Sequence, residues 1–165
     1  PLTRNNILHL FRSLGTLDGL RDFTLTTNGT LLARHAGELK AAGVTRINIS
    51  LDTLQPERFH NITRTGHLER TLQGIDAALE AGFQRVKINS VILKHRNHDE
   101  IVDLVEFCLQ RGMDISFIEE MPLGVINEHD RAEAYYSSDR ILQDLQQRFS
   151  LLPTTESTGG PSRYY

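Results

Sequence analysis

Short apolar runs alternate along the chain with longer segments in which apolar residues recur every three or four positions. Runs of the first kind are typical of strands, and segments of the second kind are typical of helices. The pattern predicts strands over residues 22–27, 45–51, 85–93 and 115–119. It predicts helices over residues 3–14, 31–42, 56–59, 68–81 and 138–148, and a further helix that Asn97 and Asp99 cap and that runs to about Arg111.

The regular exchange of strands and helices indicates the fold class. Glycines follow three of the helices, at the position where a helix commonly stops. The remaining linkers are polar, and we interpret residues 63–67 and 123–136 as loops and residues 153–165 as a turn-rich tail. The chain is therefore predicted to be α/β, with about four parallel strands, right-handed crossovers and no internal domain boundary.

Two polar clusters end neighbouring apolar runs. Residues 26–29 read Thr-Thr-Asn-Gly, and residues 47–52 read Ile-Asn-Ile-Ser-Leu-Asp. In a parallel sheet covered by helices, the carboxyl ends of the strands are where polar side chains converge on a ligand. Asn48, Ser50 and Asp52 share one face of their strand because side chains repeat every two residues. The strand ends are thus the predicted site.

The same residues also have purely structural interpretations. Thr26 could close a turn with Asn28 and Gly29. Ser50 could be a buried hydroxyl that is satisfied inside the fold, and Asp52 could cap a helix. The pattern by itself leaves both kinds of role open.

Lys87 lies inside an apolar strand, in the sequence Val-Lys-Ile-Asn-Ser-Val. A parallel strand is expected to be buried on both faces, where an unpaired ammonium group is costly. We therefore expect an anion, such as a triphosphate, to face Lys87. A lysine that extends to solvent, or that pairs with an acidic side chain, is the alternative.

Composition and charge narrow the function classes. The 165 residues are 39% apolar and 24% charged, which is typical of a globular domain with a sizeable core. A formal net charge of -3 argues against a nucleic-acid partner. The sequence has no apolar run long enough for a membrane span and no signal pattern, so we predict a cytoplasmic protein without a membrane partner. Its one cysteine, Cys108, is expected to be a packing residue.

Other suggestive residues are expected to be structural. Glu119 and Glu120 are adjacent, so in a strand they point to opposite faces and cannot form one acid/base pair. Glu119 is expected to brace the site. His95 and His98 flank a helix start and are interpreted as surface residues rather than metal ligands. Gly159–Gly160 is not followed by the helix and lysine of a phosphate-binding loop, so we interpret it as a turn.

Six motifs in order carry a resemblance to a known family. They are Pro-Leu-Thr-Arg (1–4), Thr-Leu-Thr-Thr-Asn-Gly (24–29), Ile-Asn-Ile-Ser-Leu-Asp-Thr-Leu (47–54), Val-Lys-Ile-Asn-Ser-Val (86–91), Phe-Ile-Glu-Glu-Met-Pro (117–122) and Gly-Pro-Ser-Arg-Tyr-Tyr (160–165). Together they resemble the molybdenum cofactor biosynthesis protein A family, the GTP 3′,8-cyclases among the radical S-adenosylmethionine enzymes. The resemblance extends over the whole chain.

The resemblance implies roles for single positions. Thr26 and Lys87 match residues that bind GTP, and Ser50 and Met121 match residues that bind S-adenosylmethionine. The positions that would support the site are Arg4, Asn28, Asn48, Asp52 and Glu119. Without the resemblance, Met121 would be an ordinary core residue and Arg4 a solvated one. No catalytic residue and no metal ligand is expected within the chain.

The resemblance also implies that parts of the family's domain lie outside residues 1–165. The family has a Cys-x3-Cys-x2-Cys motif near its N-terminus for a [4Fe-4S] cluster, and three further cysteines near its C-terminus for a second one. We expect residues 1–165 to form the central and later part of a partial TIM-type barrel. This piece would hold no cluster and would be inactive alone. We expect exposed apolar surface where two N-terminal barrel units would pack, and this surface would favour oligomers or low solubility.

The implied reaction of the full-length protein belongs to molybdenum cofactor biosynthesis. GTP would be converted to 3′,8-cyclo-7,8-dihydro-GTP, with S-adenosylmethionine and two [4Fe-4S] clusters as cofactors. The product would pass to cyclic pyranopterin monophosphate synthase, and a homodimer is left open. A radical S-adenosylmethionine enzyme with another substrate, or a small α/β nucleotide-binding module, are the alternatives.

Overall fold

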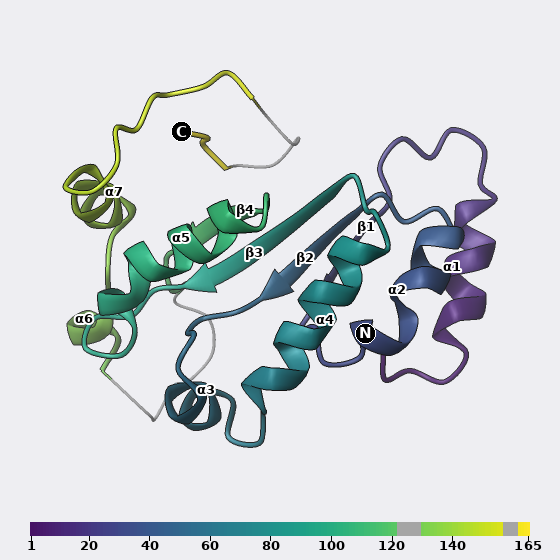
Figure 1. Ribbon diagram of the computed structural model, residues 1–165, viewed down its shortest axis with the longest axis horizontal. Helices are drawn as coiled ribbons and strands as arrows, with labels where there is room; N and C mark the ends of the chain where they lie inside the picture. The colour runs from purple at the N-terminus through teal and green to yellow at the C-terminus, as the bar shows by residue number, and fades with distance from the viewer. Residues whose placement is uncertain (122–129, 157–161) are drawn as a thin grey trace.

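Four parallel strands form a single sheet in the part of the chain that the structure describes. The structure is a computed structural model that describes residues 1–121, 130–156 and 162–165. The strands lie in chain order and are β1 (Thr24–Thr27), β2 (Arg46–Ser50), β3 (Arg85–Val91) and β4 (Asp114–Ile118). In Figure 1 the arrows of β2 and β3 point toward the end of the sheet where α3 and α6 lie. The predicted α/β class with four parallel strands is confirmed.

Helices connect the strands and pack on the sheet and on one another. They are α1 (Ile7–Gly15), α2 (Leu32–Ala41), α3 (Pro56–Thr63), α4 (Leu68–Glu80), the 3-10 turn η1 (His98–Glu100), α5 (Ile101–Gln110), α6 (Arg131–Ala134) and α7 (Ser138–Gln146). Helix α4 packs against α2 and β3, and α5 packs against β4 and α7 (Figure 1). None of the helices in the described ranges is both long and apolar enough to cross a lipid bilayer.

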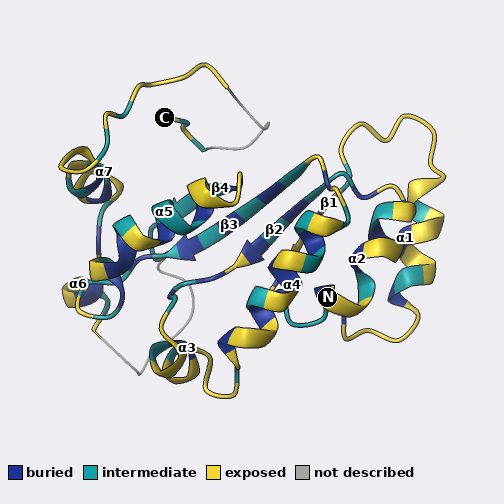
Figure 2. Cartoon of the chain, viewed as in Figure 1, coloured by how far each residue is buried: buried dark blue, intermediate teal, exposed yellow. Residues whose placement is uncertain are grey.

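One face of the sheet is buried and the other is open. Burial alternates along β1, β2 and β3. Figure 2 shows this as a change of colour along β2 and β3. The buried apolar side chains of these strands are Leu25, Ile47, Ile49, Val86 and Ile88. They form one core with α1, α2 and α4, while a smaller core lies around α5 and α7. The expectation that the strands are buried on both faces is wrong here, because the described helices cover one face only.

Several element boundaries differ from the predictions. Helix α1 begins at Ile7 rather than at residue 3, because Asn6 adopts a left-handed conformation with φ of 59° that a helix cannot include. Helix α3 continues four residues further than predicted, to Thr63. The stretch 123–136 was expected to be a loop, yet it contains α6, whose first turn is capped by Asp130 accepting from the Ala132 N–H at 2.8 Å.

Two of the interpretations from the sequence fall outside the described residues. They are the first part of the loop at 123–136, through residue 129, and the turn at Gly159–Gly160.

Glycines allow α4 to approach the turn that follows β1. Gly29 has a φ of 81°, which is easily adopted only without a side chain. Gly74 of α4 lies so close that a Cβ added there would be 2.1 Å from the Gly29 carbonyl oxygen. Thr71, one helical turn earlier, donates from Oγ1 to the Asn28 carbonyl oxygen at 3.2 Å. Helix α4 therefore fixes the position of the turn that carries Asn28.

Candidate functional site

A row of polar side chains crosses the open face of the sheet. Thr26, Asn48, Lys87 and Asp114 are register partners on β1, β2, β3 and β4. Asn48 donates from Nδ2 to Thr26 Oγ1 at 3.3 Å. Because neighbouring strands lie about 4.8 Å apart, the backbones at Thr26 and Lys87 are separated by about 10 Å. The structure thus places the two predicted GTP-binding residues in one row, with Asn48 between them.

A second polar row lies one step nearer the carboxyl ends of the strands. Ser50, Asn89 and Ser116 are register partners on β2, β3 and β4. Two residues along a strand span about 6.6 Å, so Ser50 lies on the same face as Asn48 and about that far beyond it. Ser50 is exposed. The interpretation of Ser50 as a buried hydroxyl is therefore wrong.

A small pocket of about 180 Å³ lies at the carboxyl ends of β1 and β2. Three predicted site residues, Asn28, Ser50 and Asp52, form part of its lining. The facing wall comes from α3 and the loop after it and includes Phe59 and Thr63. Hydroxyl, amide and carboxylate groups beside an aromatic ring make a pocket suited to a small polar ligand.

Asp52 links the tips of two strands instead of capping a helix. Its Oδ1 accepts from the Val91 N–H at 2.8 Å. Burial raises the pKa of the Asp52 carboxyl, and the hydrogen bond from Val91 opposes this in part. A raised pKa means that the folded chain disfavours the carboxylate, so the contribution of Asp52 to stability is lost as the pH rises through that pKa.

The turn after β1 is closed by residues next to Thr26. The hydroxyl of Thr27, rather than that of Thr26, accepts from the Gly29 N–H at 3.3 Å. Asn28 accepts through Oδ1 from the hydroxyl of Thr30 at 2.9 Å, in the manner of a side chain that organises its own turn. This leaves the Thr26 hydroxyl on the open face, where its contact is Asn48.

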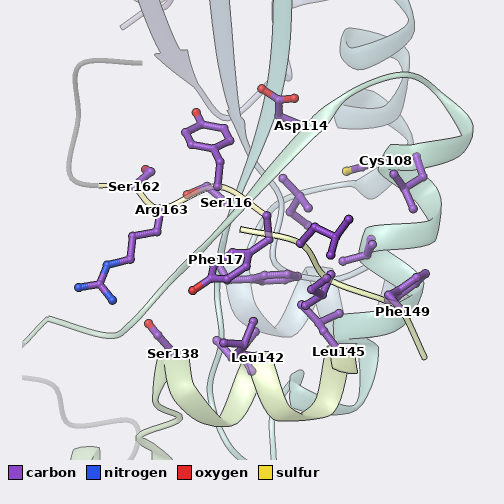
Figure 3. Close-up of a pocket in the computed structure, with 18 of the residues that line it drawn as sticks. Cys108, Asp114, Ser116, Phe117, Ser138, Leu142, Leu145, Phe149, Ser162 and Arg163 are labelled. Atoms are coloured by element: carbon purple, nitrogen blue, oxygen red, sulfur yellow. The ribbon is translucent and has the colours of Figure 1, made fainter. Parts of the chain in front are cut away.

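A larger cleft of about 770 Å³ lies beside β4 (Figure 3). Lys87 forms part of its lining. Apolar side chains of α5 and α7 form one part of it, and Ser116, Ser162 and Arg163 contribute polar groups. Lys87 is half-buried rather than enclosed. The apolar part includes Leu152, which is 77% exposed. The apolar surface expected where N-terminal barrel units would pack stays a prediction, as do oligomerisation and low solubility.

The other predicted residues lie away from the two cavities. Met121 follows β4 and is 61% exposed, so it is not an ordinary core residue. Arg4 is exposed in the segment before α1. Glu119 accepts from the Ser138 N–H at 2.6 Å and from the Tyr135 hydroxyl at 2.8 Å, and these bonds lower the pKa of its carboxyl. Glu119 therefore braces the start of α7 against the end of β4.

Asn97 has a role that the sequence did not reveal. It is 1% exposed, and its side chain does not cap the helix. The amide instead donates from Nδ2 to the carbonyl oxygens of Asp52 at 2.8 Å and Val91 at 2.9 Å. Glu100 and Arg58, which sequence reasoning also missed, contact the same region. The bonds from Asn97 to Asp52 and from Glu100 to Thr53 and Arg58 join residues more than 40 positions apart, so a local sequence pattern does not reveal them.

The residues suspected of metal chemistry do not form a metal site in the described part of the chain. His95 is exposed and donates its backbone N–H to Nδ1 of His98 at 3.1 Å. No group of three or more histidine, cysteine, aspartate or glutamate side chains with metal-binding geometry occurs among the described residues. Cys108 is 1% exposed in the core. With one cysteine, and that one buried, the residues present do not fit the thiolate ligands of an iron–sulfur cluster.

Cys108 is expected to resist alkylation in the folded protein. Burial raises the pKa of its thiol to about 12, so the reactive thiolate is scarce at pH 8. We expect iodoacetamide to modify Cys108 at least about a thousandfold more slowly in native protein than in protein unfolded with urea. Mass spectrometry of the peptide that contains Cys108 measures both rates. Similar rates in the two states would contradict the buried, protonated thiol.

The fold and the site together define a parallel α/β domain whose polar side chains gather at the strand ends and on the open face of its sheet. Residues 1–108 match the radical SAM superfamily, and the chain belongs to that superfamily. Its members use S-adenosylmethionine together with an iron–sulfur cluster.

The curated relatives include several proteins named GTP 3′,8-cyclase. The chain is 52% identical over all 165 residues to the one from Pseudomonas syringae pv. syringae (strain B728a). It is 54% identical to the one from Ectopseudomonas mendocina (strain ymp) and 52% identical to the one from Marinobacter nauticus (strain ATCC 700491 / DSM 11845 / VT8), again over its full length. The chain spans about half the length of each of these relatives, 50% in all three cases.

Proposed function

We propose that this chain is part of a GTP 3′,8-cyclase of molybdenum cofactor biosynthesis and contributes surfaces for both GTP and S-adenosylmethionine. The observation that carries the proposal is the row formed by Thr26, Asn48 and Lys87, with Ser50 one step beyond it on the same face. Relatives of that name are 52–54% identical over the whole chain, which supports the same assignment.

Each of these residues has a role that its chemistry permits. The Lys87 ammonium would pair with a phosphate group of GTP, and the Thr26 hydroxyl would bind a phosphate or ribose oxygen. Ser50 and Asp52, at the small pocket, would bind polar groups of S-adenosylmethionine, and Met121 would lie near its adenine. S-adenosylmethionine, when bound together with a reduced iron–sulfur cluster, would supply a 5′-deoxyadenosyl radical. The chain's own residues would bind and orient the two ligands.

The proposal also covers the clusters, the cellular location and the partners of the full-length protein. It includes two [4Fe-4S] clusters, held by cysteines that this sequence does not contain, and a cytoplasmic location. The cyclised product would be consumed by cyclic pyranopterin monophosphate synthase, and a homodimer would be the assembly to test first.

The test is turnover by the full-length gene product after anaerobic reconstitution of its clusters. With GTP, S-adenosylmethionine and a reductant, we expect 5′-deoxyadenosine to form together with a product isomeric with GTP. Liquid chromatography with mass spectrometry detects both. Formation of 5′-deoxyadenosine only when a substrate other than GTP is added would contradict the cyclase assignment and favour a different radical SAM enzyme.

Replacing Ser50 with alanine is expected to weaken the binding of S-adenosylhomocysteine, a stable analogue of the cofactor, by about fivefold. That is the usual effect of removing one neutral hydrogen bond. GTP affinity is expected to stay unchanged, because Lys87 and Thr26 remain. Isothermal titration calorimetry measures both affinities. Ser13→Ala, on the exposed side of α1, is the matched control. Equal affinity in Ser50→Ala and Ser13→Ala would remove Ser50 from the cofactor site.

A further inference from the structure

The turn after β2 is held from behind by a buried amide. Asn97 uses both hydrogens of its Nδ2 group, for the Asp52 carbonyl oxygen at 2.8 Å and the Val91 carbonyl oxygen at 2.9 Å. Its Oδ1 accepts from the Leu93 N–H at 2.8 Å. Because Asn97 is almost completely buried, these bonds form away from competing water. The amide therefore joins the tips of β2 and β3.

A buried carboxylate holds the next part of the same turn. Glu100 is 2% exposed, one helical turn after Asn97. Its Oε1 accepts from the Thr53 hydroxyl at 2.6 Å, and its Oε2 accepts from the Leu54 N–H at 2.8 Å. A buried carboxylate needs several such donors, and two of them come from the turn that begins at Ser50.

Arg58 connects α3, which forms the opposite wall of the small pocket, to the carboxylate of Glu100. It belongs to α3 and donates from Nη1 to Glu100 Oε1 at 2.5 Å. The guanidinium also makes two bonds to the exposed carboxylate of Asp99, at 2.8 and 3.0 Å. Phe59 and Thr63, on the same helix as Arg58, line the pocket across from Ser50. Glu100 therefore contacts both walls, one through the turn and the other through Arg58.

We propose that Glu100 and Arg58 are positioning residues that set the separation between the two walls of the small pocket. The inference rests on the proposed function, in which this pocket binds part of S-adenosylmethionine. Neither residue lines the pocket, so each would act through the elements that it holds. Loss of the shared ion pair would let α3 and the Ser50–Leu54 turn move apart, so that the pocket would bind its ligand more weakly.

The test compares Glu100→Gln and Arg58→Lys with Asp99→Asn in the full-length gene product. Asp99→Asn removes the same charge one residue away and also loses a partner of Arg58. Within the described part of the chain, Asp99 makes no hydrogen bond to the turn. Calorimetry gives the affinities for S-adenosylhomocysteine and for GTP. Amide hydrogen exchange measures the protection of the Leu54 N–H, which donates a hydrogen bond to Glu100.

We expect Glu100→Gln and Arg58→Lys to weaken the binding of S-adenosylhomocysteine by about tenfold and to leave GTP affinity within about twofold. Leu54 should exchange faster in Glu100→Gln. Asp99→Asn should match the wild type in all three measurements. Should Glu100→Gln fail to fold, Arg58→Lys carries the comparison, because it keeps a cation beside Glu100 and changes only the shape of the contact.

The outcomes separate the inference from the proposed function. Wild-type protein that does not bind S-adenosylhomocysteine would contradict the proposed function. Wild-type protein that binds it, with both variants binding equally well, would overturn the inference alone. Parallel loss of affinity for both ligands, together with a lower unfolding temperature, would assign the network to general stability and would also overturn the inference.

Discussion

Replacing Lys87 with alanine is expected to weaken GTP binding by about 10- to 100-fold, the largest effect on binding that we expect in this chain. A hydrogen bond between a charged donor and a charged acceptor contributes about 1.5–3 kcal/mol, which corresponds to that range. Lys87 lies in the middle of β3, half-buried, on the open face and in one row with Thr26. Calorimetric titration of the full-length gene product with GTP measures the effect.

The charges around Lys87 explain why an external anion is expected there. Arg85, one step earlier on the same face of β3, is paired with Asp114 at 3.1 Å. Arg46, on β2, is paired with Asp22. Lys87 makes no ion pair within residues 1–121, 130–156 and 162–165, although Asp114 is its register partner. A half-buried ammonium group that has no ion-pair partner in those ranges is well placed to bind a phosphate.

Two variants make the Lys87 result interpretable. Lys40→Ala removes the same charge from the helix-covered side, where Lys40 donates to the Gly82 carbonyl oxygen at 2.5 Å, and should leave GTP affinity unchanged. Lys87→Arg keeps the charge and should retain most of the affinity. If Lys40→Ala lost as much GTP affinity as Lys87→Ala, the effect would be one of net charge. That result would contradict the phosphate-binding role of Lys87.

Local patterns predicted the elements well because the forces involved act over a few residues. The apolar run at residues 85–93 predicted β3. Gly43 and Gly82 marked the ends of α2 and α4. The main errors are also local. Because Asn6 has a left-handed backbone, α1 begins later than predicted, at Ile7. The Asp130 cap starts a four-residue helix inside a predicted loop. Both features depend on a local backbone conformation that the residue type permits but does not require.

The environment of the site residues depended on information that a local pattern does not contain. Lys87 alternates with apolar neighbours, which is the signature of a half-buried strand, but the assumption of a sheet covered on both faces suggested a fully buried lysine. Thr26, Asn48 and Lys87 each fell on a predicted strand. That they form one row follows from the register between strands, which is set by the packing of the whole sheet.

The network behind the small pocket was the least predictable part. Asn97 precedes a helix, and the sequence pattern indicated a capping residue. Its amide bonds a carbonyl group 45 residues away, and Glu100 bonds Thr53 at a separation of 47 residues. Such contacts exist only once the crossover helices have brought the tips of β2 and β3 together. Glutamate is seldom buried, so a core role for Glu100 was not expected from its residue type.

Replacing Gly74 with alanine is expected to destabilise the protein by about 1–3 kcal/mol, which is the usual range for overpacking a core. The added methyl group would lie 2.1 Å from the Gly29 carbonyl oxygen and 3.2 Å from Leu32 Cβ. The first of these atoms belongs to the backbone and cannot rotate away. Helix α4 or the Asn28–Gly29 turn would have to shift, which would also disturb the small pocket. Thermal unfolding of the full-length gene product measures the loss.

Gly37→Ala is the matched control for this prediction. Gly37 lies in α2, is exposed, and has no heavy atom within 4 Å of the position of an added Cβ. Because alanine favours the helix interior by about 1 kcal/mol over glycine, this variant should be slightly more stable than the wild type. The same chemical change is therefore expected to have opposite effects in two helices that pack against each other. Equal unfolding temperatures for the two variants would show that α4 does not approach the turn after β1 as closely as described.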